Sequence, residues 1–305
     1  MSTDWIPVEL MSAGKRSMVR WIHPGSRALF LEPFFNQTVD ALIAAHSPQK
    51  LTPIDELADV QPVKAPKGFI FHVSRCGSTL VSRSLAGVAR HRVISEAAPV
   101  NQLLLAEHLA PRHKAQLLKG LIHALCGTAA DTNCFIKFTS WNLLFLAQIR
   151  ELFPATPWVF IYREPAEILQ SLTASAPRWA ANQALLRHTA NPYPAGVEQM
   201  IFTLQGIFSA PLPHLNRQAR PVNYTQLPAA ILDILAHFGL ALDPAEQGQI
   251  VRMGQYDAKQ TGEVAFQARK REPLPASVIE ALAPLNLLYN EWEQIRNGSE
   301  QVHAE

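Results

Sequence analysis

The side chains best suited to chemistry in this chain follow an apolar run in a short polar segment. Residues 74–79 read Ser-Arg-Cys-Gly-Ser-Thr and come directly after Phe-Ile-Phe-His-Val. Backbone N–H groups in a tight turn, with a helix N-terminus behind them, form a cradle for an anion. Gly77 lets the backbone approach a ligand closely, and Arg75 adds a forked guanidinium suited to phosphate or sulfate oxygens. The segment predicts an oxyanion site contacted by Arg75, Cys76, Gly77, Ser78 and Thr79.

A simpler interpretation of this segment is a strand–turn–helix connection in which Ser or Thr caps the helix. It is not a Walker A motif, because GxxxxGK[ST] is absent and no lysine follows Gly77.

A second pair of anion-binding side chains stands eight residues apart. Arg163 ends the apolar run 157–162, and Ser171 lies about two turns into the helix that Pro165 starts. A phosphate above that helix would meet the guanidinium from one side and the hydroxyl from the other. The alternative is a surface arginine beside an unrelated polar helix position. The two segments together, each after an apolar run, favour a shared anionic ligand.

Both segments sit in a regular alternation of strands and helices. Strands are predicted at 68–73, 91–95, 134–138, 157–162 and 222–224, and helices at 78–90, 100–109, 111–126, 141–153, 165–173 and 228–238. This alternation predicts a three-layer α/β/α fold with a central parallel sheet. Ligands of such sheets bind beyond the carboxyl ends of the strands, which is where both segments lie.

The first 66 residues follow a different pattern. Residues 19–23 and 27–31 predict short strands around a Pro-Gly turn, residues 34–46 predict a helix, and the proline-bearing stretch 47–66 predicts a linker. We therefore expect an N-terminal extension over residues 1–66 and one α/β domain over residues 67–300.

The two polar segments resemble the donor-binding motifs of the sulfotransferases. SRCGSTL is similar to the loop that binds the 5′-phosphosulfate, and Arg163 with Ser171 matches the arginine–serine spacing of the 3′-phosphate motif. Cys76 stands where serine is commoner, and Glu164 where Asp or Asn is commoner. The resemblance implies a P-loop NTPase-like fold. Within the family, the chain resembles the bacterial type. The resemblance also implies the donor 3′-phosphoadenosine-5′-phosphosulfate (PAPS), with 3′,5′-adenosine bisphosphate as product.

Further positions carry the resemblance along the chain. Tyr224, in a segment similar to the family's YExL…P…FLGL pattern, is implied to contact the nucleotide, although Gln226 replaces the usual acid. Arg269 and Lys270 resemble a late Arg-Lys pair that grips the 3′-phosphate, within a polar stretch 254–275 that would make a flap over the donor. The alternatives are a core tyrosine and a solvated charge run.

Sulfuryl transfer needs cations for the leaving phosphate and a base for the acceptor proton. Arg75 is the candidate for the leaving phosphate, and Lys137 resembles the lysine of the cytosolic KTH segment. Thr139 stands where that branch has its basic histidine, so Glu96 is the candidate base, as in the tyrosylprotein branch. We expect a partly apolar pocket to raise the pKa of Glu96 into a useful range. His72, inside the first strand, is a second candidate, and no metal is expected. The alternatives are a packed residue for His72, a helix cap for Glu96 and a lysine that reaches solvent from a strand end for Lys137.

Composition and charge argue against several other classes of protein. A net charge of +2 argues against a dedicated nucleic-acid binder, and no run approaches the ~20 apolar residues of a membrane helix. The N-terminus does not read as a signal peptide, and three cysteines without a CxxC pair indicate a reducing, cytoplasmic compartment.

The rival functions are a P-loop-type, ATP-dependent phosphotransferase and a nucleotide-binding protein that has lost catalysis. The acceptor is expected to be a small molecule or peptide, in a pocket that Trp141, Trp179 and Tyr193 could line unless they pack in the core. The sequence specifies neither the acceptor nor the oligomeric state.

Overall fold

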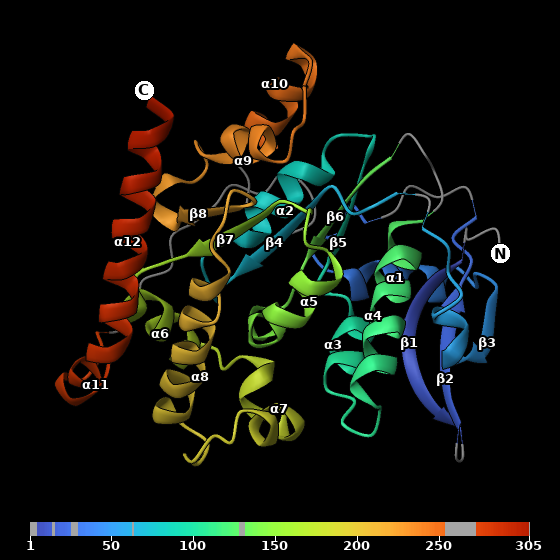
Figure 1. The fold of residues 1–305 in the computed structure, drawn as a ribbon, viewed down its shortest axis with the longest axis horizontal. Coiled ribbons are helices and arrows are strands. Elements are labelled where there is room, and N and C mark those ends of the chain that lie inside the picture. The colour runs from blue at the N-terminus through green and yellow to red at the C-terminus, as the bar shows by residue number, and fades with distance from the viewer. Residues whose placement is uncertain are drawn as a thin grey trace.

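A five-stranded parallel sheet forms the centre of the protein (Figure 1). The computed structural model describes residues 5–13, 16–25, 30–62, 64–127, 132–253 and 273–304, and it describes their side chains except at 12–13 and 299–304. The strands are β4 (Gly68–His72), β5 (His91–Ser95), β6 (Asn133–Lys137), β7 (Trp158–Tyr162) and β8 (Ala219–Asn223). Every residue of β4 and β7 is buried, which explains why both strands read as unbroken apolar runs.

The order of the strands creates a topological switch point at β4. The sheet runs β5–β6–β4–β7–β8, so the chain builds one side of β4 first and then crosses to the other side for β7. His72 at the end of β4 is in register with Ile161 near the end of β7, and the loops that follow these strands begin side by side. Ligand sites of parallel α/β sheets form at such a point.

Helices cover both faces of the sheet, which confirms the predicted three-layer α/β/α fold. Figure 1 shows α2 and α10 on one side of the sheet and α5 and α8 on the other. The helices are α1 (Phe35–Ala44), α2 (Ser78–Ala86), α3 (Ala98–Leu104), α4 (Pro111–Cys126), α5 (Leu146–Leu152), α6 (Pro165–Ala174), α7 (Gln183–His188), α8 (Val197–Ser209), α9 (Ile231–His237), α10 (Pro244–Met253), α11 (Ala276–Ala281) and α12 (Ala283–Ala304). Short 3-10 turns are η1 (Ile54–Leu57), η2 (Ser140–Phe145), η3 (Arg178–Ala181), η4 (Leu212–His214) and η5 (Tyr224–Gln226).

The predicted helix over 141–153 is two elements. Thr139 and Asn142 form a capping box that starts the 3-10 turn η2, and α5 begins only at Leu146. Tyr224 likewise opens η5 rather than ending a strand, since β8 ends at Asn223. Thr139, Asn142 and Tyr224 therefore lie in the segments that follow β6 and β8, at the carboxyl edge of the sheet.

The N-terminal region contains more structure than the sequence predicts. Strands β1 (Ile6–Ala13), β2 (Arg16–Ile22) and β3 (Gln49–Pro53) form an antiparallel sheet, of which only β2 was expected. The predicted strand over 27–31 is wrong where it can be checked, because Phe30 and Leu31 lie outside any strand; residues 26–29 are outside the described residues. The predicted linker contains β3 and η1, because pairing with β2 across the sequence outweighs the local proline signal.

The N-terminal sheet packs directly on the α/β part of the chain. The backbone N–H of Leu10 donates to Oε1 of Gln102 at 2.7 Å. Gly120 of α4 lies so close to η1 that a Cβ there would stand 1.6 Å from the carbonyl oxygen of Leu57. Buried residues of both regions belong to one hydrophobic cluster. The division into an extension and a domain stays a prediction.

Cys126 and Cys134 form a disulfide that the sequence analysis did not predict. Their Cα atoms are 5.3 Å apart, and the bond joins the end of α4 to β6. Oxidising surroundings favour disulfides, so this pairing does not support the predicted reducing compartment. Within the described part of the chain, no helix has both the length and the apolarity to cross a bilayer.

Candidate active site

The loop between β4 and α2 has the geometry of an anion cradle. Gly77 adopts φ +81 and precedes α2, and its carbonyl accepts the N–H of Leu80. A Cβ on Gly77 would lie 2.9 Å from Leu227 and 3.1 Å from the ring of Tyr224. Glycine is therefore required both by the left-handed backbone and by the close approach of Tyr224. The phosphosulfate site at this turn stays a prediction.

Arg75 is held in a strained conformation within this loop. Its φ is +61, in the left-handed region that a long side chain seldom adopts. Its guanidinium donates to the carbonyl of Ser175 at the end of α6 (3.0 Å), while its own carbonyl accepts from Nη1 of Arg163 (3.2 Å). The loop is thus tied to the strand end at β7. The assignment of Arg75 to the leaving phosphate stays a prediction.

Arg163 lies against both the loop and Tyr224. Its guanidinium carbon is 4.0 Å from the ring centroid of Tyr224, within the range of a cation–π contact. Its Nε donates to the carboxylate of Glu167 on α6. The structure therefore brings together three separately predicted residues, Gly77, Arg163 and Tyr224, from loops after three different strands.

The other residues predicted to bind the sulfuryl donor differ in their surroundings. The Cys76 thiol donates to the Val73 carbonyl at 2.8 Å, and burial raises its pKa to about 12, so it stays neutral and faces the core. Ser78 and Thr79 are buried at the start of α2, and Ser171 is half-buried in the second turn of α6. Arg269 and Lys270 fall outside the described residues. For Cys76, only its backbone can take part in anion binding.

A buried ion pair joins the predicted base to the predicted lysine. Nζ of Lys137, whose side chain is 0% exposed, lies 2.6 Å from Oε1 of Glu96, whose side chain is 25% exposed. The same ammonium is 3.4 Å from Oγ1 of Thr79 at the start of α2. Glu96 is not a helix cap, because Ala97 takes that position for α3. The two groups therefore lie beside the cradle, at the sheet edge where the sequence placed them.

The expected direction of the Glu96 pKa is wrong. Burial acts to raise the pKa of this carboxyl, but the adjacent Lys137 ammonium, aided by His72, outweighs burial and holds the pKa well below its usual range. The sequence did not reveal this because the lysine comes from a different strand. Glu96 is therefore an ionised carboxylate at neutral pH.

Residues that the sequence analysis did not assign complete the surroundings. The ring of Phe34 has its centroid 5.2 Å from Nζ of Lys137, so the N-terminal region reaches the ion pair. Asn101 donates to Oγ1 of Thr139 at 2.9 Å and accepts from Asn142 at 3.0 Å. No strand-end signal points to the Asn101 amide, because Asn101 lies within α3; Asn142 lies in η2, shortly after β6.

The three aromatic residues expected at an acceptor pocket have different positions. Trp179 donates its indole N–H to Oγ of Ser74 in the cradle loop at 3.2 Å. Trp141 is buried and packs edge-on against Phe145, which matches the alternative of core packing. Tyr193 is 44% exposed. Of these three residues, Trp179 is the one with a hydrogen bond to the predicted donor loop.

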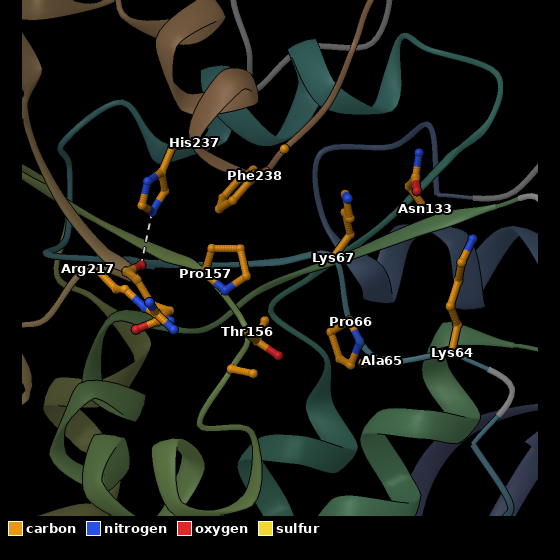
Figure 2. Close-up of a pocket in the computed structure, with 13 residues that line it drawn as sticks. Lys64, Ala65, Pro66, Lys67, Asn133, Thr156, Pro157, Arg217, His237 and Phe238 are labelled. Carbon is orange, nitrogen blue, oxygen red and sulfur yellow. Dashed lines mark hydrogen bonds between the residues drawn. The ribbon is translucent and has the colours of Figure 1, made fainter. Parts of the chain in front are cut away.

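A cavity of about 530 Å³ lies at the other edge of the sheet, where the strands begin. Figure 2 shows Lys64, Lys67, Asn133, Arg217 and His237 among its lining residues. These residues precede or open β4, β6 and β8, or end α9. The cavity is separate from the cradle, which lies at the carboxyl ends.

Metal ligands were not expected. In the ranges that the structure describes, no group of three or more His, Cys, Asp or Glu side chains is placed to hold a metal ion. A metal-free reaction stays a prediction.

Comparisons with known proteins found matches among solved structures. No family model matches the chain, and no curated protein matches it. Among solved structures, sulfotransferase STF9 from Mycobacterium avium superposes with a TM-score of 0.50 at 13% identity, covering 87% of this chain and 83% of that one. Sulfotransferase STF1 from Mycobacterium tuberculosis H37Rv gives 0.40 at 16% identity, over 64% and 73%. The sulfotransferase domain of the Synechococcus PCC 7002 olefin synthase gives 0.40 at 16% identity, over 65% and 80%.

At these identities the likeness establishes the fold. The chain therefore has the fold of the sulfotransferase STF9, which confirms the resemblance predicted from its motifs at the level of the fold.

Proposed function

We propose that the protein is a sulfotransferase that moves the sulfuryl group of PAPS to a hydroxyl or amine of a small-molecule or peptide acceptor. The observation that carries this proposal is the meeting of the cradle loop with Arg163 and Tyr224 at the switch point of the sheet. A doubly phosphorylated adenosine carries two anionic groups, one for the cradle loop and one for Arg163.

Each donor contact has a physical reason. The backbone N–H groups of residues 75–79, at the start of α2, suit the 5′-phosphosulfate. Arg163 and Ser171 suit the 3′-phosphate, and Tyr224, already stacked on Arg163, offers its ring to the nucleotide. Arg75 and the late pair Arg269 and Lys270 are assigned by resemblance alone.

The proposed catalytic groups are Glu96 and Lys137, which form the ion pair beside the cradle. The donor supplies an electrophilic sulfur and a phosphate leaving group. Glu96 is ionised and partly exposed, so it can accept the acceptor proton. Lys137 lies between Glu96 and the start of α2, where its charge stabilises negative charge spreading over the sulfuryl oxygens.

The rival ATP-dependent phosphotransferase fits these residues less well. A P-loop kinase places a lysine in the loop itself, whereas Lys137 comes from β6 and is paired with a carboxylate. The inactive nucleotide-binding hypothesis predicts no functional base, so Glu96 is the residue that separates it from the proposal.

A thermal-shift assay tests the donor class. We expect 3′,5′-adenosine bisphosphate to raise the melting temperature more than ATP–Mg²⁺ at equal concentration, because a ligand of the native state stabilises it. Saturating bisphosphate at about 100 times its dissociation constant would add about 2.7 kcal/mol. A larger shift with ATP–Mg²⁺ would overturn the donor assignment.

A further inference from the structure

His72, the last residue of β4, has one ring nitrogen engaged and one that faces the candidate base. Nδ1 lies 2.7 Å from the carbonyl oxygen of Val73. A carbonyl oxygen only accepts, so Nδ1 carries a proton. Nε2 is buried without a hydrogen-bond partner and lies 3.6 Å from Oε1 of Glu96. In the neutral ring, Nε2 therefore presents its lone pair towards the Glu96 carboxylate.

Glu96 alone is a poor resting place for a proton. Lys137 lies 2.6 Å from the same Oε1 and stabilises the ionised carboxylate, and protonation would leave a fully buried ammonium without its counter-charge. A group that must hold the acceptor proton after transfer would have to avoid this cost. Imidazole exchanges protons near neutral pH and lies next to the carboxylate here.

We propose that His72 is the positioning residue that takes the acceptor proton from Glu96. This rests on the proposed function. The acceptor oxygen attacks sulfur as the bond from sulfur to the phosphate oxygen breaks, and its electron pair leaves with the phosphate. The acceptor proton passes to the Glu96 carboxylate and from there to Nε2 of His72. Solvent later removes it from the imidazolium.

The charges support this direction of proton movement. Before transfer, His72 is neutral and the trio of His72, Glu96 and Lys137 has no net charge. Afterwards, Glu96 is again a carboxylate, now between an imidazolium and an ammonium, and each cation reaches Oε1. Val73 keeps its hydrogen bond from Nδ1 in both states, which fixes the ring. The ring therefore need not turn during the cycle.

The other charged or titratable groups near the trio belong to the loops at the same edge. Cys76 follows β4 and interacts with the Lys137 charge, and burial keeps it a neutral thiol. Arg163 follows β7 and acts on Cys76 from the far side. β7 itself presents Ile161 in register with His72. Glu96 is thus the anionic group that the structure places beside Nε2.

The first test needs neither donor nor acceptor, so it stands apart from the proposed function. NMR of protein labelled with ¹⁵N-histidine should show the His72 ring protonated at Nδ1 and unprotonated at Nε2, as the hydrogen bond to the Val73 carbonyl requires. A ring protonated at Nε2 and not at Nδ1 would overturn the proposal.

The second test separates proton acceptance from simple hydrogen bonding. The amide of Asn in His72→Asn can replace Nδ1, and that of Gln in His72→Gln can replace Nε2, but neither can take the proton. With labelled PAPS and tyramine as probe acceptor, both variants should lose about 100-fold or more of kcat while binding bisphosphate normally. His91 also has Nδ1 on a backbone carbonyl and a buried, unpartnered Nε2, so His91→Asn is the matched control and should stay within about threefold. Activity in His72→Gln within threefold of the wild type, or an equal loss in His91→Asn, would overturn the relay.

Discussion

Charged side chains lie at both edges of the central sheet, but the two groups differ in burial. At the carboxyl edge, Glu96, Lys137 and Arg163 are largely buried and paired with protein groups. At the amino edge, Lys64 and Arg217 are exposed around an open cavity (Figure 2). Burying charge costs several kcal/mol per ion before pairing repays it. The buried ion pair of Lys137 and Glu96 lies at the carboxyl edge, and we propose that this edge is the functional one.

Two residues with positive φ lie at the carboxyl edge of the sheet. Arg75 and Glu96 adopt φ +61 and φ +59 in the loops after β4 and β5, while Phe30, His46 and Ala190 adopt positive φ elsewhere. Such a conformation costs about 1–3 kcal/mol for a residue with a side chain. We propose that strain at the two loops that hold the candidate base and the cradle keeps these side chains in place for chemistry.

Two basic groups at the amino edge, His237 and Lys67, lie against the ends of strands and of a helix. Nε2 of His237 lies 2.9 Å from the carbonyl oxygen of Gln218 and 3.2 Å from that of Trp158, where β7 and β8 begin. Nζ of Lys67 stands near Gly239, 3.6 Å from where a Cβ would be, at the C-terminus of α9. A cation there favours the helix dipole. These groups close strand and helix ends, so removing them should leave ligand binding intact.

The largest effect on stability is expected from Glu96→Gln. The substitution keeps the shape of the side chain but leaves the Lys137 ammonium buried and unpaired, which should cost about 3–5 kcal/mol. Urea unfolding at pH 7 measures the loss. Glu246→Gln is the control, because it breaks an ion pair with Arg90 at the surface and should change stability little. Equal losses in both variants would show that the carboxyl-edge pair is not special.

The pH dependence of this loss checks its cause. The pKa of Glu96 is lower in the folded chain than in the unfolded one, so its stabilisation is complete above the unfolded value of about 4.3 and is lost as pH falls below it. The gap between wild type and Glu96→Gln should therefore narrow in urea melts from pH 5 towards pH 2. A constant gap would mean that the Glu96 charge does not stabilise the fold.

The next effect is on ligand binding at the same edge. Arg163→Ala removes charged hydrogen bonds and the contact with Tyr224, and should weaken 3′,5′-adenosine bisphosphate binding by about 1.5–3 kcal/mol, roughly 10- to 100-fold. Calorimetric titration measures it. Arg217→Ala, at the amino edge, is the matched control and should bind normally. If Arg217→Ala weakened binding more than Arg163→Ala, the ligand would belong to the cavity of Figure 2.

The contrast between the edges also explains what the sequence could reveal. β4 and β7 are buried on both faces, so their apolar runs predicted the sheet and placed the cradle and Arg163 at strand ends. The close contact of Gly77 with Tyr224 joins segments about 150 residues apart, and the family resemblance was the signal that paired them.

What the sequence missed depends on contacts between distant segments. β3 alternates exposed and half-buried residues, and it became a strand only by pairing with β2. The pKa of Glu96 falls because Lys137, from another strand, reaches it; neither residue's own neighbours indicate that pair. Phe34 reaches the same lysine from the N-terminal region, which no motif covers. Local patterns thus predicted the elements, while the electrostatics needed the tertiary structure.

A smaller effect is expected from Gly77→Ala. Alanine at φ +81 costs about 1–2 kcal/mol, and its Cβ would also press on Leu227 and Tyr224. Gly25→Ala is the control, since Gly25 has φ +65 and nothing within 4 Å of a Cβ. Urea melts should show a greater loss for Gly77→Ala, and calorimetry should show weaker bisphosphate binding in that variant alone. Identical results would mean that the cradle tolerates a side chain.

The smallest effect is expected from Lys67→Met at the amino edge. Methionine keeps the apolar stem of the lysine but removes the charge beside the C-terminus of α9, which should cost about 0.3–1 kcal/mol of stability. Raising the salt concentration should shrink the difference from wild type in urea melts, because the dipole interaction at the surface is screened. Bisphosphate affinity should not change, because Lys67 lies at the start of β4 and the cradle lies at its end. A loss of affinity in Lys67→Met would show that charge at the amino edge acts on the donor site across the sheet, and the functional separation of the two edges would then be wrong.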